Sequence, residues 1–322
     1  MYLLGGLKMA SKNQPFCHYF EEWIELYKKG AVRPVTYEKY VMTLRNLTKI
    51  APKLKLSELD KRKYQSIINE YALTHERATT KDFNAHLKAA ILDAMDEGLI
   101  KIDPTRKVVI KGKEPTRKKR PKFLSNEDLI KLVSVLDLSD IRNEENEVNW
   151  DWFILVLIKT GFRFAEALAL TPQDFDFEKN TLSVTKSWNY KDFNNSRFQK
   201  TKNKSSVRTI IIDQNLSKDL KKLIKDMPAD KPIFINGERI FSSVINDKLH
   251  QRCRKAGIPE VSMHSLRHTH ASMLLYADVS IANISKRLGH ANTTTTMEVY
   301  LHIIKELEDR ENDKINSFLA SI

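Results

Sequence analysis

The chain has 322 residues but only nine glycines, and none of them forms a phosphate-binding loop. Neither the pattern GxxxxGK[ST] nor the pattern GxGxxG occurs. In these loops, closely spaced glycines let backbone N–H groups approach the phosphates of a nucleotide. The sequence therefore argues against an enzyme driven by nucleotide hydrolysis, and it predicts no bound cofactor.

Cysteine and long apolar runs are also scarce. The two cysteines, Cys17 and Cys253, lie far apart and match no metal-ligand spacing. The apolar start, Met1 to Lys8, has no basic region before it and no small-residue cleavage site, so it does not resemble a secretory signal. No apolar run approaches the roughly 20 residues that a membrane helix needs. Together these absences predict a protein of the reducing cytoplasm.

Positive charge, in contrast, is abundant and unevenly distributed. Lysine and arginine number 54 against 41 acidic residues, which gives a net charge of +13. Residues 1–122 hold 26 basic and 14 acidic side chains, whereas residues 123–322 hold 28 and 27. Such asymmetry indicates that the first part lies on a polyanion. Charge alone leaves a merely solubilising surface as the alternative.

The first part of the chain has the pattern of a helical domain. Residues 1–14 are a short extension, and residues 15–110 contain apolar stripes at helical spacing. In the first stripe, Phe16, Trp23 and Tyr27 fall on one face. Four such stretches predict a compact four-helix domain.

A basic linker and a second domain follow. Residues 111–122 hold two prolines, one acid and no apolar periodicity, so they predict an extended segment along DNA. Residues 123–322 form the second domain, ending in a tail, 301–322. Helical patterns dominate it, but 181–188 and 207–213 have the alternating, β-branched pattern of strands. The predicted DNA contacts of the linker are Lys111, Lys113, Arg117, Lys118, Lys119 and Arg120.

Charged residues of the second domain stand in otherwise apolar surroundings. Arg163 occurs in "KTGFRFAEALAL". A guanidinium group placed there must be paired or must face a site, because an unpaired buried charge is costly. Glu166, three residues later, is the candidate partner. An ion pair of purely structural importance is the alternative.

Histidines gather near the carboxyl end, where six of the nine lie between residues 250 and 302. His264 and Arg267 share one helical face in "VSMHSLRHTHASMLL". A metal site formed by His264, His268 and His270 is weighed and set aside. These histidines lack the carboxylate or thiolate partners and the spacing of known zinc signatures.

The order of these polar residues is the most specific signal. After Arg163 come a lysine-rich hairpin region, the pair His264 and Arg267, then His290 after a glycine turn, and finally Tyr300. The chain resembles the tyrosine recombinase family, the phage-integrase class, from about residue 15 to residue 322. The matching pieces are "FEEWIELYKKGAVRPVTYEKY", "TGFRFAEALAL", "TKNKSSVRTI", "HSLRHTHAS" and "LGHANTTTTMEVYLH".

The resemblance implies a fold and a set of roles. The fold is two-domain and mainly α: a helical SAM-like core-binding domain, then a mixed α+β catalytic domain with a small antiparallel sheet. The family's lysine best matches Lys202, with Lys200 and Lys204 close by. The implied catalytic set is Arg163, Lys202, His264, Arg267, His290 and Tyr300, with Glu166 in support.

The implied activity is site-specific DNA recombination for a phage or other mobile element. Tyr300 would attack a phosphodiester and form a 3′-phosphotyrosyl bond, without metal or ATP. The implied partners are double-stranded DNA attachment sites and, in some systems, a directionality factor. The protein would be a monomer in solution, a homotetramer on DNA, and associated with the nucleoid.

Two alternatives are kept. A type IB topoisomerase-like enzyme would use similar chemistry to relax DNA as a monomer. A DNA-binding regulator with a vestigial site would keep the fold without the reaction. The intact set of polar residues argues against the regulator, and the integrase-like first domain argues against the topoisomerase.

Overall fold

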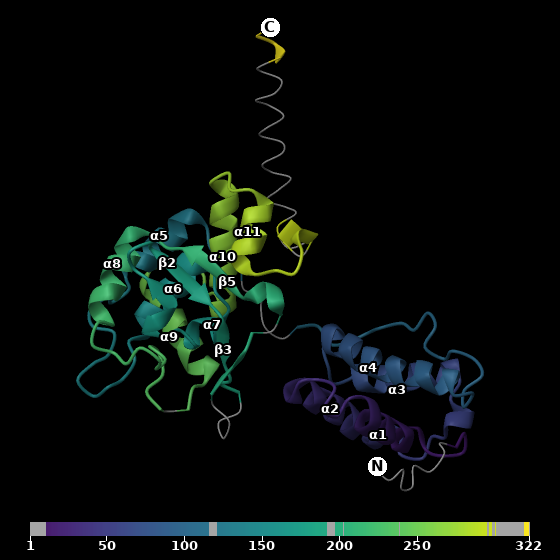
Figure 1. The fold of residues 1–322 in the computed structure, drawn as a ribbon. Coiled ribbons are helices and arrows are strands. Elements are labelled where there is room, and N and C mark those ends of the chain that lie inside the picture. Colours follow the sequence, from purple (N-terminus) through teal and green to yellow (C-terminus); the bar gives the residue numbers. More distant parts are fainter. Residues whose placement is uncertain are drawn as a thin grey trace. The chain divides into compact units, whose positions relative to one another are not determined.

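The computed structural model describes residues 11–115, 121–191, 197–201, 203–237, 239–294, 296–297, 300 and 319–321. The chain divides into two compact units, Met1–Lys118 and Lys119–Ile322 (Figure 1). Most of the described elements are helices, so the predicted two-domain, mainly helical architecture is confirmed. The finer domain limits stay predictions. In the described ranges, no helix is both long and apolar enough to cross a lipid bilayer.

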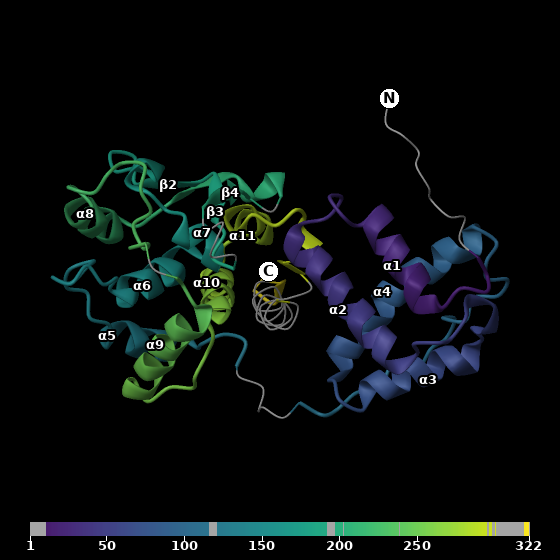
Figure 2. The ribbon, with the colours of Figure 1, turned by 90° about the horizontal axis from the view of Figure 1, so that it is seen from below.

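Four helices form the first unit, as the apolar stripes predict (Figure 2). Large aromatic side chains such as Phe20 and Tyr64 are fully buried between them. The indole N–H of Trp23 donates to a carboxylate oxygen of Asp93 at 2.5 Å, which ties the first helix to the fourth. The helices are α1 (Phe16–Tyr27), α2 (Pro34–Ile50), α3 (Lys61–Ala72) and α4 (Arg77–Asp96).

The second unit combines helices with short strands. Its helices are α5 (Asn126–Ser134), α6 (Trp150–Thr160), α7 (Phe164–Leu168), α8 (Gln214–Leu223), α9 (Ser242–Lys255), α10 (Met263–Tyr276) and α11 (Ile281–Leu288). Its strands are β1 (Phe175–Asp176), β2 (Thr181–Val184), β3 (Lys186–Trp188), β4 (Phe198–Lys200) and β5 (Arg208–Ile211).

The strands form the predicted small antiparallel sheet. β1, β2 and β5 pair in that order, with Leu182 opposite Ile210, and both side chains are buried. A separate hairpin pairs β3 with β4. The predicted strand over 181–188 is therefore divided between two sheets. In Figure 1, β2 and β5 lie side by side and α11 contacts β5, so the sheet brings the start of β5 close to the end of α11.

α6 is the central helix of the second unit. Its residues from Asp151 to Ile158 are all buried, as expected for a helix that is apolar on every face. It begins at Asn149, whose side chain accepts from the N–H of Asp151, and it ends at Gly161 with φ at 68°. A side chain on Gly161 would also lack room, because a Cβ atom would lie 2.6 Å from the His270 ring. α10 packs directly on α6 and α11, so this close approach is built into the core.

Replacing Gly161 by alanine is expected to lower the free energy of unfolding by about 2–4 kcal/mol, because left-handed strain and overpacking add together. Gly257→Ala is the matched control. Gly257 has φ at +67°, but no atom lies within 4 Å of its added Cβ. It is expected to cost only about 1–2 kcal/mol, from strain alone. Urea unfolding of both variants measures the difference, and equal losses would contradict the packing argument.

Candidate active site

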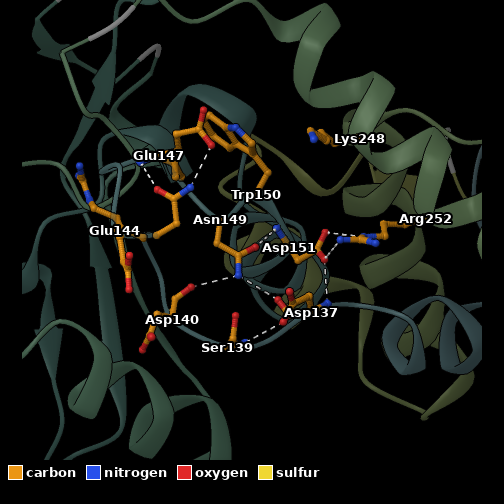
Figure 3. A pocket seen from close by; sticks show the side chains of 13 residues that line it. Asp137, Ser139, Asp140, Glu144, Glu147, Asn149, Trp150, Asp151, Lys248 and Arg252 are labelled. Atoms are coloured by element: carbon orange, nitrogen blue, oxygen red, sulfur yellow. Dashed lines mark hydrogen bonds and ion pairs between the residues drawn. The ribbon is translucent and has the colours of Figure 1, made fainter.

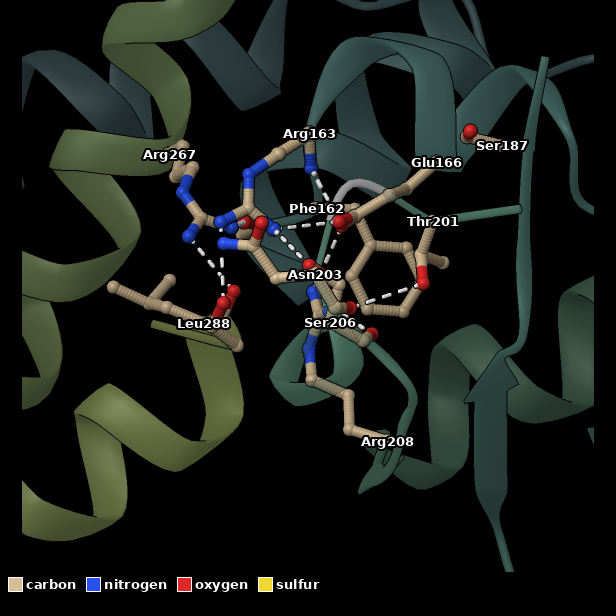
Figure 4. Close-up of polar contacts among 12 residues, drawn as sticks. Phe162, Arg163, Glu166, Ser187, Thr201, Asn203, Ser206, Arg208, Arg267 and Leu288 are labelled. Atoms are coloured by element: carbon tan, nitrogen blue, oxygen red, sulfur yellow. Dashed lines mark hydrogen bonds and ion pairs between the residues drawn. The ribbon is translucent and has the colours of Figure 1, made fainter. Parts of the chain in front are cut away.

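Arg163 lies just before α7 and is held by α7 and by two other segments (Figure 4). Its backbone N–H donates to Glu166 Oε2 at 3.0 Å, and its Nη1 donates to Glu166 Oε1 at 2.7 Å. Nη1 also donates to the hydroxyl of Ser206 at 3.2 Å, and Nη2 donates to the carbonyl of Gly289 at 3.1 Å. The Arg163–Glu166 pair suggested by the sequence is therefore present, and it joins α7 to the segments before β5 and after α11.

Arg267 projects from α10 into the same region and is only 4% exposed. Its Nη1 donates to the carbonyl of Gly161 at 2.8 Å, and its Nη2 donates to the carbonyl of Leu288 at 2.7 Å. Burial, reinforced by the charge of Arg163, lowers the pKa of Arg267 to about 9. The group stays protonated at neutral pH.

Both guanidinium groups keep N–H donors that bond to no residue described in the structure. A guanidinium carries five N–H donors. Among the described residues, the side chain of Arg163 makes three hydrogen bonds and that of Arg267 makes two. Arg163 is also 29% exposed at its side chain. Planar donors with fixed orientation suit the oxygens of a phosphate.

Glu166 is the negative charge among these arginines. Its side chain is 4% exposed, and Arg208 Nη2 donates to its Oε2 at 3.0 Å. Burial alone would raise its pKa, but Arg208 and Arg163 hold the pKa of this carboxyl below its usual range. Three arginines around one ionised carboxylate leave an excess of positive charge, which favours an anion.

His264 and His290 both lie close enough to Arg163 and Arg267 for the two positive charges to lower the pKa of each ring. His264 is exposed in the first turn of α10. His290 follows Gly289, and its Nδ1 is 2.8 Å from the hydroxyl of Thr296. Burial and the charges of Arg267 and Arg163 lower the pKa of His290 to about 4, so its ring is neutral at pH 7.

Tyr300 is buried, with 2% of its surface exposed. Its hydroxyl is 2.9 Å from Nδ1 of His268. Burial, with the nearby His264 and Arg267, lowers the pKa of His268 to about 4, so the His268 ring is neutral at pH 7. Burial raises the pKa of Tyr300 to about 12, although the positive charge of Arg267 acts to lower this pKa. In this arrangement the phenol is protonated and held.

The structure thus brings five of the six predicted catalytic residues, together with Glu166, into one region. Lys202 lies outside the described residues. So do Arg117, Lys118, Lys119 and Arg120, whereas Lys111 and Lys113 belong to the first unit. The residues brought together are Arg163, Glu166, His264, Arg267, His290 and Tyr300.

Sequence reasoning assigned no role to four residues that line this region. His268 was considered only as a metal ligand, yet it contacts Tyr300. Ser206 and Arg208 stand in the matching piece "NKSSVRTI", which was the available signal. Thr296, which holds His290, lies in a run of four threonines that gives no such signal.

Two of the histidines weighed as metal ligands, His268 and His270, are bonded to other groups of the protein. His270 uses both ring nitrogens: Nδ1 bonds to the carbonyl of Ile158 at 2.8 Å, and Nε2 accepts from Arg287 Nε at 2.9 Å. In the part of the chain that the structure describes, no group of three histidine, cysteine or acidic residues has the arrangement of metal ligands.

A cleft of about 570 Å³ in the second unit is rich in carboxylates, unlike the arginine-rich candidate site (Figure 3). Its lining includes Asp137, Asp140, Glu144 and Glu147. Carboxylates repel phosphate, so this cleft is not a candidate for binding a nucleic acid backbone.

The comparisons with known proteins agree with the site. Residues 122–306 match the model of the phage integrase family. The chain is 25% identical to an integrase of Staphylococcus phage L54a, covering 96% of this chain and 94% of that relative. It is 26% identical to a XerC-like tyrosine recombinase of Caldanaerobacter subterraneus, covering 98% and 87%. The chain belongs to the phage integrase family, so the predicted family is confirmed.

Solved structures show the same fold. The Tn1549 transposon integrase in complex with transposon right-end DNA superposes with a TM-score of 0.73 at 18% identity, covering 92% of this chain and 99% of that one. A lambda integrase dimer bound to a core site gives a TM-score of 0.64 at 15% identity, covering 88% and 97%. The predicted enzyme class, a site-specific recombinase of the tyrosine type, follows from the family.

The neutral histidines predict a stability that falls in mild acid. The pKa of His270 is lowered to about 4 by burial and by Arg287. Between pH 6.5 and pH 4 the unfolded chain therefore binds a proton that the folded chain does not, and stability decreases as the pH falls. His270 contributes on the order of 3 kcal/mol to this loss. Urea unfolding between pH 7 and pH 4.5 should give a shallower pH dependence for His270→Gln. The exposed His18→Gln serves as the control and should keep the wild-type slope.

Proposed function

We propose that Tyr300 is the nucleophile of DNA strand cleavage and that Arg163 and Arg267 hold the scissile phosphate. One observation carries this proposal: two arginines with unused N–H donors lie in the same site as a buried tyrosine whose hydroxyl is bound by a neutral histidine. A phosphodiester would satisfy the unused donors and bring the electrophile next to the phenol.

The substrate we propose is double-stranded DNA at an attachment site. Two relatives of the same fold are solved in complex with DNA. The first 122 residues carry 26 basic against 14 acidic side chains, which suits contact with a phosphate backbone. Lys111 and Lys113, and the basic residues up to Arg120, are proposed as backbone contacts of this kind.

The reaction proceeds by phosphoryl transfer to tyrosine. The Tyr300 oxygen attacks phosphorus, a 3′-phosphotyrosyl bond forms, and the 5′ oxygen leaves. The arginines and His290 donate to the nonbridging oxygens, where charge develops, and each such donor is worth about 2.7–4 kcal/mol. His264 accepts the phenol proton, and Lys202 gives a proton to the departing 5′ oxygen. The 5′-hydroxyl of a second DNA strand reverses the step, so the bond energy is conserved.

Tyr300 must leave His268 before it can react. In the present arrangement its hydroxyl is bound to His268, and its pKa is raised to about 12. A bound phosphate next to Arg267 supplies the electrophile, and the two arginines stabilise the phenolate that forms.

Assembly is part of the same proposal. Recombination of two sites needs four protomers, so we propose a monomer in solution and a homotetramer on paired DNA sites. The tail, residues 301–322, would dock on a neighbouring catalytic domain, although residues 301–318 lie outside the described part of the chain. A directionality factor and a location at the nucleoid in the cytoplasm complete the proposal.

Tyr300→Phe is expected to bind DNA with wild-type affinity and to form no covalent adduct, because the phenol oxygen is the atom that joins to phosphorus. The test uses a duplex from the junction of the element that carries this gene, with a nick a few nucleotides from the scissile phosphate. A denaturing gel then reports trapped protein–DNA adducts.

Tyr276→Phe, a change on an exposed tyrosine of α10, is the matched control and should cleave normally. An adduct formed by the Tyr300→Phe variant would overturn the assignment. If the wild-type protein binds the duplex but forms no adduct, the vestigial regulator becomes the better description. A two-site assay that yields relaxation without strand exchange would favour the topoisomerase.

Lys202→Ala is expected to lose cleavage of an ordinary phosphodiester by orders of magnitude. A substrate with sulfur at the 5′-bridging position should restore cleavage, because a thiolate leaves without a proton. Lys200→Ala and Lys204→Ala are the controls, since both lysines flank the same turn. Rescue of one of these instead of Lys202→Ala would show that another lysine is the general acid.

A further inference from the structure

Arg208 is a buried arginine at the start of β5 that the reaction scheme does not use. Its side chain is 5% exposed. All three of its nitrogens are bound by the protein: Nη2 donates to Glu166 Oε2 at 3.0 Å, Nη1 to the carbonyl of Ser206 at 2.8 Å, and Nε to the carbonyl of Arg287 at 2.5 Å. The guanidinium also lies 4.9 Å from the centre of the Phe162 ring. Each Arg208 nitrogen is therefore already bonded, whereas Nε of Arg163 and Nε of Arg267 bond to no described residue. Arg208 is thus less suited than these two arginines to binding substrate.

Glu166 links Arg208 to the proposed phosphate site. Its Oε2 accepts from Arg208 and from the backbone N–H of Arg163, while its Oε1 accepts from the Arg163 guanidinium. A buried carboxylate needs compensating charge. Without Arg208, Arg163 alone would have to compensate it, and the guanidinium would be drawn toward Glu166 and away from the phosphate.

The end of α11 provides a second link. Arg208 donates to the carbonyl of Arg287, and the next carbonyl along the chain, of Leu288, accepts from Arg267. The carbonyl after that, of Gly289, accepts from Arg163. Three successive carbonyls are thus bound by three arginines from different segments. The row ends one residue before His290.

The packing at Gly289 shows how close these groups are. A Cβ atom on Gly289 would lie 3.0 Å from Arg208 Nη1 and 3.1 Å from the Cα of Ser206. The Ser206 hydroxyl in turn accepts from Arg163. Arg208 Nη1 also donates to the carbonyl of Ser206, so this residue is bonded to both arginines.

We propose that Arg208 is a positioning residue of the recombination reaction, which orients the Arg163 guanidinium through Glu166 and fixes the end of α11 that carries His290. This inference rests on the proposed function of Arg163. It predicts that Arg208 affects the rate of cleavage far more than the binding of DNA.

The test replaces Arg208 by methionine, which keeps the length of the side chain but removes every donor. On the nicked junction duplex, the single-turnover rate of adduct formation at saturating protein should fall about 10- to 100-fold, as expected for a misplaced catalytic group. The Kd for an intact duplex should change less than threefold. Arg208→Lys, which keeps the charge without the planar fork, should give an intermediate rate.

Arg252→Met is the matched control. Arg252 pairs with the buried Asp151 at 2.6 Å, so its loss also leaves a buried carboxylate uncompensated, but in the acidic cleft rather than at the site (Figure 3). This variant should lose stability and cleave at a rate within threefold of the wild type. A defect of Arg208→Met no larger than that of Arg252→Met would reduce Arg208 to a stabilising role.

A double-mutant cycle separates positioning from general destabilisation. If Arg208 acts through Arg163, the double variant Arg163→Lys with Arg208→Met should cleave at a rate within threefold of that of the slower single variant. Arg163→Lys with Arg252→Met should show independent, multiplicative effects. Multiplicative effects for the Arg208 pair would overturn the proposal.

Three remaining cases are distinguished as follows. If Arg208→Met does not fold, Arg208→Lys takes its place in the same cycle. If Arg163→Lys cleaves at the wild-type rate, the proposed function of Arg163 fails. If Arg163→Lys is slow and Arg208→Met is normal, only the inference about Arg208 fails.

Discussion

The carboxyl end of α11 is the part of the structure on which the site depends. The last carbonyl groups of a helix have no partner within the helix and carry partial negative charge. Here the carbonyls of Arg287, Leu288 and Gly289 each accept a hydrogen bond from a different arginine. Each of these bonds supplies a carbonyl at the end of α11 with a hydrogen-bond partner and also fixes the position of one guanidinium group. The same contacts therefore hold α11 in place and gather the positive charge of the candidate site. The buried Glu166 limits the resulting repulsion between Arg163 and Arg208.

Local patterns made much of this predictable from the sequence. The apolar stripe with Trp23 and the turn at Gly161 are set by residues near in the chain, so the helices around them could be expected. Arg163 and Arg267 stood out because charged residues in apolar stretches need a partner or a site. The order of these residues with His290 and Tyr300 then indicated the family, which the match over residues 122–306 confirms. The catalytic roles of all these residues, and that of Lys202, stay predictions.

Tertiary contacts account for what the sequence did not reveal. In the sequence, Arg208 is one of several charged residues near a short predicted strand, and nothing in that pattern indicates its partners. Its partners Glu166 and Arg287 are 42 and 79 positions away, and only the packing of β5 between α7 and α11 makes them neighbours. His268 and Tyr300 are likewise 32 positions apart. A histidine-rich stretch also gives no sign that both nitrogens of His270 are already bonded.

Because the arginines bind main-chain carbonyls, the site is insensitive to most changes in the side chains around it. Any residue at position 287 or 288 supplies the same acceptor atom, provided that the backbone keeps its course. Among the residues whose carbonyls bind these arginines, glycine is required at Gly161 and Gly289, where a Cβ atom would meet neighbouring groups at 3.0 Å or less. Relatives at about 25% identity over nearly the whole chain have exchanged three residues in four. A scaffold of this kind can accept many substitutions on its surface while Arg163, Arg208 and Arg267 keep their positions.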